Sequence, residues 1–152
     1  MLDLQEGTGP VPVLDADAAV ALLVAALRIA IVGASPDPFR PSHSVMATLI
    51  RAGYDCVPVN PAVDAILGVP AYPTLESATE ATGPFDIVDV FRRPEHVPGI
   101  ARSAVAVGAT ALWLQFGVVS WEGARIAHEG GLAVVMDRCT AIDLRRVTDG
   151  GR

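Results

Sequence analysis

The sequence predicts one α/β domain built on a doubly wound, mostly parallel sheet of five strands or slightly more, with helices on both faces. Short apolar runs alternate along the chain with runs of helical periodicity, which is the pattern of repeated strand–helix units. The apolar runs show no polar alternation, as expected for strands that are buried on both faces. Hydrophobic residues make up 51% of the chain and aromatic residues only 5%, which favours a sheet packed with small aliphatic side chains.

The length of 152 residues fits a single domain with its own core, and we place that domain at residues 15–152. Residues 1–14 contain two glycines and two prolines and have no periodicity, so we predict a flexible N-terminal arm there. Asp15 or Asp17 is expected to cap the first helix.

The remaining elements follow from periodicity and from glycine and proline positions. We expect strands at about 29–32, 54–60, 85–91, 110–115 and 132–136, and helices at about 15–27, 42–52, 74–81, 94–107, 120–129 and 140–147. Ser42 is the expected N-cap of the second helix, and Thr140 with Asp143 has the spacing of a capping box. Pro58 cannot donate to a strand ladder, which predicts that its strand lies at or near an edge.

The charge pattern excludes several classes of partner. The net charge is −6, all eleven basic residues are arginine, and no basic block occurs, so nucleic acid is a poor candidate. The apolar stretch 18–27 is too short to span a bilayer and follows acidic residues, which predicts neither a membrane span nor a secretory signal. Cys56 and Cys139 lack metal-ligand spacing and are expected to be free thiols in a reducing compartment. We therefore predict a cytoplasmic protein without a metal site.

One stretch, Arg28 to Gly53, organises the predicted ligand site. A buried strand ends at Gly33, a turn of small residues follows, and then a helix begins. A helix start offers unpaired N–H groups and the positive end of a dipole, which favours an anion. Parallel strands linked by right-handed crossovers bring their carboxyl ends to one edge, where ligands bind in such sheets. The segments that leave those ends are 33–35, 60–61, 91–94, 115–117 and 137–139.

A nicotinamide dinucleotide fits this turn less well. The dinucleotide fingerprint needs two further glycines, and Ser35 and Pro38 occupy those positions. An acidic residue normally ends the second strand to hold a ribose, whereas this chain has Asn60. A phosphate-binding loop of the lysine type is impossible without lysine. An NAD(P)-dependent small oxidoreductase stays open as an alternative.

Several short motifs occur together in a characteristic order. They are Val32-Gly33-Ala34-Ser35, Pro58-Val59-Asn60-Pro61, Gly68, Phe91-Arg92-Arg93-Pro94-Glu95, Trp113-Leu114-Gln115-Phe116-Gly117 and Asp137-Arg138-Cys139. Together they resemble the small stand-alone CoA-binding domain proteins, which are similar to the CoA-binding Rossmann domain of the succinyl-CoA synthetase alpha subunit. The resemblance covers about residues 27–147.

The resemblance implies a Rossmann-like domain that holds CoA or an acyl-CoA across its strand ends. It places the phosphates at the turn Gly33-Ala34-Ser35 and at the following helix start, where Arg40 and Ser42 add donors. It implies that Asn60 and Pro61 line the nucleotide side and that Phe91, Arg92 and Arg93 line the opposite wall. Family members often carry a basic residue just after the Asn-Pro pair, but Ala62 and Val63 stand here, and Arg40 is the expected substitute.

Two further residues lie at strand ends. Gln115 is either a core amide or a ligand contact. Cys139 near a helix start lacks an obvious base, because the three histidines fall on other predicted helices.

With no nucleophile–base pair, acid pair or metal spacing, the sequence favours a non-catalytic CoA or acyl-CoA binding protein. A regulatory or scaffolding subunit with a degenerate site is the other alternative, and a homo-oligomer or a protein partner is possible.

Overall fold

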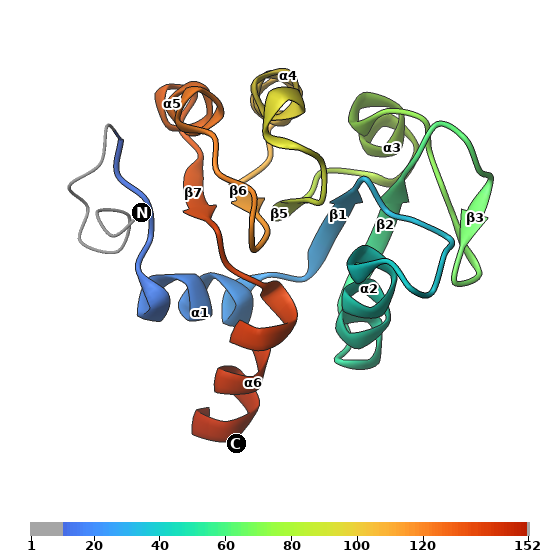
Figure 1. Cartoon of the computed structure of the whole chain (residues 1–152), viewed down its shortest axis with the longest axis horizontal. Helices are drawn as coiled ribbons and strands as arrows, with labels where there is room; N and C mark the ends of the chain where they lie inside the picture. Colours follow the sequence, from blue (N-terminus) through green and yellow to red (C-terminus); the bar gives the residue numbers. More distant parts are fainter. Residues whose placement is uncertain (1–10, 152) are drawn as a thin grey trace.

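The computed structural model describes residues 11–151 and confirms the predicted α/β architecture. Five parallel strands form the sheet in the order β2-β1-β5-β6-β7 (Figure 1). Their bounds are β1 (Arg28–Val32), β2 (Asp55–Val59), β5 (Ile87–Val90), β6 (Ala111–Leu114) and β7 (Ala133–Met136). Because the chain adds β2 on one side of β1 and β5 on the other, the strand order reverses at β1. Such a switch point opens a crevice at the carboxyl ends of the strands.

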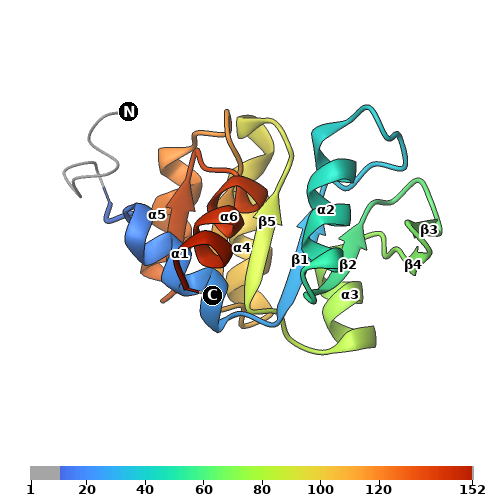
Figure 2. The ribbon, with the colours of Figure 1, turned by 90° about the horizontal axis from the view of Figure 1, so that it is seen from below.

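Helices cover both faces of this sheet, as predicted. They are α1 (Ala16–Ala25), α2 (Pro41–Arg51), α3 (Leu75–Thr82), α4 (Val97–Ala106), α5 (Trp121–Glu129) and α6 (Thr140–Gly151), with a 3-10 turn η2 (Pro94–His96) before α4. Helices α3, α4 and α5 lie on one face, and α1, α2 and α6 lie on the other (Figures 1 and 2).

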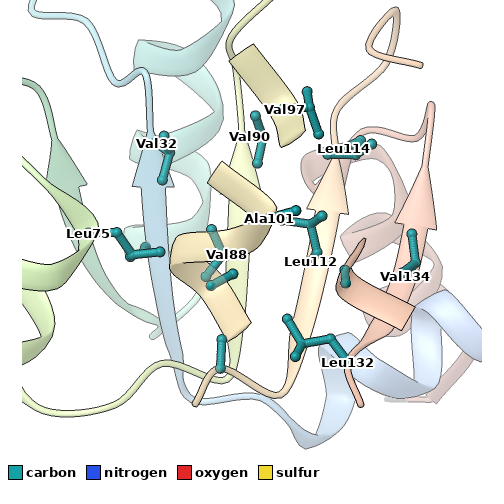
Figure 3. Close-up of a cluster of buried hydrophobic side chains, with 14 of the residues drawn as sticks. Val32, Leu75, Val88, Val90, Val97, Ala101, Leu112, Leu114, Leu132 and Val134 are labelled. Carbon is teal, nitrogen blue, oxygen red and sulfur yellow. The ribbon is translucent and has the colours of Figure 1, made fainter. Parts of the chain in front are cut away.

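The two faces have separate hydrophobic clusters because side chains alternate along each strand. In β1, Ala30 and Val32 belong to the cluster beneath α3, α4 and α5, whereas Ile29 and Ile31 belong to the other. Figure 3 shows the first cluster, in which β5 and β6 meet α4. Burial on both faces explains why the strands carry no polar alternation. The labelled members are Val32, Leu75, Val88, Val90, Val97, Ala101, Leu112, Leu114, Leu132 and Val134.

Side-chain caps are present at the starts of α1, α3 and α5. The Asp15 carboxylate accepts from the Ala18 N–H at 2.9 Å and begins α1, as expected. Thr74 and Ser77 form a reciprocal capping box at α3, and the Ser120 hydroxyl accepts from the Gly123 N–H at 3.0 Å at α5. These caps satisfy N–H groups that a helix cannot pair internally.

Two predicted caps are wrong. Ser42 lies inside α2, which begins at Pro41 with Arg40 as its N-cap, because proline is suited to the first helical position. Thr140 and Asp143 form no capping box. The Asp143 carboxylate instead takes two hydrogen bonds of 2.7 Å from the Arg138 guanidinium, and its side chain is only 3% exposed.

Backbone partners lie outside both edge strands. Beside β2, Tyr72 forms a parallel bridge with Val59, and a hairpin of β3 (Ala65–Ile66) and β4 (Val69–Pro70) follows the strand. The edge position predicted from Pro58 is confirmed. Beside β7, the Leu14 N–H donates to the Val134 carbonyl at 2.8 Å.

The predicted flexible arm therefore divides into two parts. Its residues 1–10 lie outside the described residues. Val11 and Val13 are buried in the cluster beneath α3, α4 and α5, so this part of the arm packs against the domain.

We expect the Arg138–Asp143 pair to contribute strongly to stability. The change Asp143→Ala leaves a largely buried guanidinium without its partner and should lower the free energy of unfolding by about 3 kcal/mol. Asp17→Ala removes the exposed pair with Arg146 and should cost about 0.5 kcal/mol. Urea titrations of both variants measure the difference, and equal losses would contradict the expectation.

Candidate functional site

Two cavities adjoin at the carboxyl ends of the strands and share the turn after β1. We call them the apolar cavity, of about 340 Å³, and the polar cavity, of about 360 Å³. The apolar cavity is lined by Gly33, Ser35, Arg40, Pro41, Ser42, Val45, Phe91, Gln115, Phe116, Val118, Cys139 and Ile142. The polar cavity is lined by Gly33, Ala34, Ser35, Arg40, Val59, Asn60, Pro61 and Arg92.

The turn at Gly33 brings two chain segments into close approach. Gly33 has a φ of +88°, a conformation that residues with a side chain rarely adopt. A Cβ at this position would lie 2.8 Å from Arg92 Cδ and 3.0 Å from the Phe91 carbonyl oxygen. Only glycine therefore lets the segment after β5 pack against the turn after β1, and this contact forms a boundary of both cavities.

Short hydrogen bonds fix the loop between β1 and α2. The Ser35 N–H donates to the Ser42 hydroxyl at 3.1 Å, and the Ser35 hydroxyl accepts from the Asp37 N–H at 3.0 Å. The Asp37 carboxylate accepts from the Phe39 N–H at 2.9 Å. This loop is ordered by its own side chains, and Ser42 supports it from the first turn of α2.

Positive charge gathers at the two cavities. Arg40 lines both of them at the N-terminus of α2, and Arg92, which follows β5, lines the polar cavity. Across residues 11–151, the ion pairs include neither arginine. A helix start and two unpaired guanidinium groups form an environment that favours an anion, and guanidinium matches phosphate geometry.

Asn60 uses its side chain to hold this site together. Its Nδ2 donates to the Ala34 carbonyl at 2.8 Å, and its Oδ1 accepts from the Ala62 N–H at 2.7 Å. The amide thereby ties the end of β2 to the turn after β1. Asn60 also lines the polar cavity beside Pro61.

A buried polar chain lies behind Gln115. The Thr140 N–H donates to Gln115 Oε1 at 3.1 Å, and the Thr140 hydroxyl lies 3.2 Å from the same oxygen and 3.0 Å from Asp89 Oδ2. All three residues are buried. Gln115 is thus both a core amide and a cavity-lining residue.

Burial also raises the pKa values of two side chains, Asp89 and Cys56. It raises the pKa of Asp89 well above its ordinary value of 3.8, and Asp89 Oδ1 has no partner in the described chain. Burial, with the nearby Asp89 carboxyl as a second cause, raises the pKa of the Cys56 thiol to about 12. Burial therefore favours the protonated form of the Asp89 carboxyl, and the hydrogen bond that the Thr140 hydroxyl donates to Oδ2 partly opposes this rise in pKa.

The structure brings ten of the eleven predicted site residues to the two cavities. Arg93 is the exception: it precedes η2, is exposed and lines neither cavity. Sequence reasoning assigned no ligand role to the other apolar-cavity residues. Phe116 and Cys139 belong to the strand-end segments 115–117 and 137–139, so their position at strand ends could have indicated that they line the site. Helical periodicity predicts that Val45 packs in the core. The same pattern cannot indicate that Val45 also lines the cavity.

No group of three or more His, Cys, Asp or Glu residues within 11–151 is arranged to hold a metal ion. None of the helices described is both long and apolar enough to cross a membrane.

The fold and the switch-point cavities define a Rossmann-like α/β domain. The sequence profile of the family described as CoA binding domain matches residues 27–145, so the chain belongs to that CoA-binding domain family. The resemblance inferred from the motifs is confirmed.

Known relatives agree with this assignment. The chain is 44% identical over 115 residues to the uncharacterized protein YneT of Bacillus subtilis (strain 168), covering 76% of this chain and 83% of that protein. A hypothetical protein from Pyrococcus horikoshii OT3 has a similar structure, with a TM-score of 0.83, 32% identity and coverage of 89% and 93%.

A larger enzyme shares the fold. The dinucleotide-forming acetyl-coenzyme A synthetase 1 of Ca. Korarchaeum cryptofilum superposes with a TM-score of 0.62 at 22% identity, over 72% of this chain and 26% of that one. At this identity the likeness concerns the fold alone.

We expect Gly33→Ala to disrupt the site more than its backbone conformation alone explains. Gly53 also has a positive φ, of +102°, but nothing lies within 4 Å of a Cβ there. Gly53→Ala therefore measures the conformational cost alone, about 1 kcal/mol. Gly33→Ala should cost at least about 1 kcal/mol more, because Arg92 and the Phe91 backbone must shift. Thermal unfolding compares the two, and equal losses would show that the close approach is unimportant.

The buried Asp89 carboxyl predicts a pH dependence of stability. Between the unfolded and folded pKa values the folded chain holds a proton that the unfolded chain has released, so stability falls as pH rises above about 4. The slope for one group is at most about 1.4 kcal/mol per pH unit. Asp89→Asn has no carboxyl to titrate and therefore does not lose stability in this way. The free energy of unfolding of the variant minus that of wild type should rise from pH 5 to pH 8, as measured by denaturant titrations. Parallel pH profiles would refute the assignment.

Proposed function

We propose that this protein binds CoA and its acyl thioesters and does not transform them. The observation that carries the proposal is the adjacency of the two cavities across the turn 33–35. One is polar and flanked by unpaired arginines, and the other is mostly apolar. CoA combines a highly charged nucleotide with a long, weakly polar arm, so a ligand of this kind matches both cavities at once.

The nucleotide end fits the polar cavity and the shared turn. Gly33, Ala34 and Ser35 line the polar cavity at this turn, and the start of α2 contributes the positive end of its dipole. Arg40 and Arg92 also line this cavity and supply the charge that this chain lacks after Asn60-Pro61. The ordered loop 35–42 reduces the entropy lost on binding.

The thioester end fits the apolar cavity. Phe91, Val118 and Ile142 line it, and Gln115 is its deep polar group. Neither cavity is lined by a histidine or a carboxylate among the described residues, so no general base faces the ligand. This arrangement favours binding and presenting a thioester over catalysing its conversion.

The same site disfavours a nicotinamide dinucleotide. Both polar groups of the Asn60 side chain are engaged by the protein, and no carboxylate ends β2 to accept hydrogen bonds from ribose hydroxyls.

Native mass spectrometry of the purified protein, before and after addition of CoA, acetyl-CoA or NADPH, tests the proposal directly. We expect a CoA or acyl-CoA adduct. An NADPH adduct alone would indicate an oxidoreductase, and no adduct would favour a regulatory or scaffolding subunit.

Arg40 should contribute most of its binding free energy through charge. We expect Arg40→Gln to weaken CoA about tenfold in calorimetric titration and to reduce the salt dependence of binding, since one charge-assisted contact is lost. Arg51→Gln removes an equal charge from the other end of α2, where the side chain bonds only to Thr48 and lines neither cavity. This control should bind CoA within twofold of wild type. Equal effects of both changes would mean that the net charge alone matters.

A further inference from the structure

Gln115 presents an unpaired donor to the apolar cavity. The residue is 5% exposed, and its Oε1 is held by the Thr140 N–H and hydroxyl. A backbone N–H can only donate, so the side-chain atom facing it is the oxygen and the atom facing away is the Nε2 amide. Within residues 11–151 the hydrogen bonds of the Gln115 side chain involve Oε1, and none involves Nε2, although the residue lines the cavity.

The contacts with Thr140 fix the orientation of the Gln115 side-chain amide. The Thr140 hydroxyl lies within donor distance of both Asp89 Oδ2 and Gln115 Oε1, and the Thr140 N–H donates to the same Oε1. The oxygen of the Gln115 amide therefore faces Thr140, and the Nε2 hydrogens face away from it. Nε2 is not among the buried side-chain atoms without a partner, so it reaches the cavity, where a ligand acceptor would gain one hydrogen bond of about 0.5–1.5 kcal/mol.

The sheet fixes how far this donor lies from the phosphate turn. Gly33 follows β1 and Gln115 follows β6, and β5 lies between these strands. Adjacent strands are about 4.8 Å apart, so the two positions are separated by about 10 Å. The second amide carbonyl of the pantetheine arm is nine bonds from the phosphorus. At about 1.2 Å of extension per bond it lies about 11 Å away, whereas the sulfur lies about 16 Å away.

Resting on the CoA-binding function proposed above, we propose that Gln115 Nε2 donates to the second amide carbonyl of the pantetheine arm. This contact makes the site selective for CoA and its thioesters over adenine nucleotides that lack the arm. The phosphate end supplies charge-based affinity that any such nucleotide shares, and Gln115 supplies the discrimination. The acyl group then lies beyond Gln115 and does not contribute to this contact.

Calorimetric titration of wild type and Gln115→Met with three ligands tests this assignment. The ligands are CoA, acetyl-CoA and adenosine 3′,5′-diphosphate, which has the nucleotide but no pantetheine arm. We expect Gln115→Met to weaken CoA and acetyl-CoA equally, by about tenfold, and to leave adenosine 3′,5′-diphosphate within twofold. Gln115→Glu, measured at pH 8, keeps the acceptor for Thr140 and replaces only the donor, and it should show the same pattern if the methionine variant does not fold.

Other outcomes overturn the assignment in distinguishable ways. A loss confined to acetyl-CoA would place the donor at the thioester carbonyl. Equal losses for all three ligands would mean that Gln115 acts through the fold, and unchanged CoA affinity would exclude any contact. If wild type binds neither CoA nor acetyl-CoA, the proposed function itself fails.

Discussion

The close approach at Gly33 is the constraint on which the whole carboxyl edge depends. The switch in strand order between β1 and β5 opens a crevice there, but backbone contact between the two strand ends determines its shape. Because Gly33 has no side chain, the Arg92 stem packs against the turn that the two cavities share. One residue thus links the conformation of the first strand–helix unit to the charge of the second.

Two side-chain amides, the half-buried Asn60 and the buried Gln115, have different roles at the site. Asn60 has both of its polar groups satisfied by backbone, and it fastens β2 to the turn after β1. Gln115 has only its oxygen satisfied, and the nitrogen stays available. The difference comes from neighbours distant in sequence: Thr140 and Asp89 occupy the oxygen side of Gln115. Local sequence could not distinguish these two roles, because the partners are contributed by other elements.

The sequence predicted the architecture because its signals are local. Uninterrupted apolar strands, glycine stops and alternating helices led to the five-stranded sheet that is observed. Helix starts were less predictable, because a serine or threonine near a helix can bond in more than one direction. Ser42 supports the loop, and Thr140 points into a buried network. Strand-end segments located most of the site, but Arg93, at the start of η2, is exposed and lines neither cavity.

The backbone contacts at the sheet edges have a consequence for assembly. An uncovered edge strand invites pairing with a second chain, which is how sheets extend across dimers and into aggregates. Here the Leu14 N–H bonds to β7, and Tyr72 bridges to β2, so both outermost strands already have a backbone neighbour. These contacts leave fewer free backbone groups on the outermost strands for a second chain to pair with.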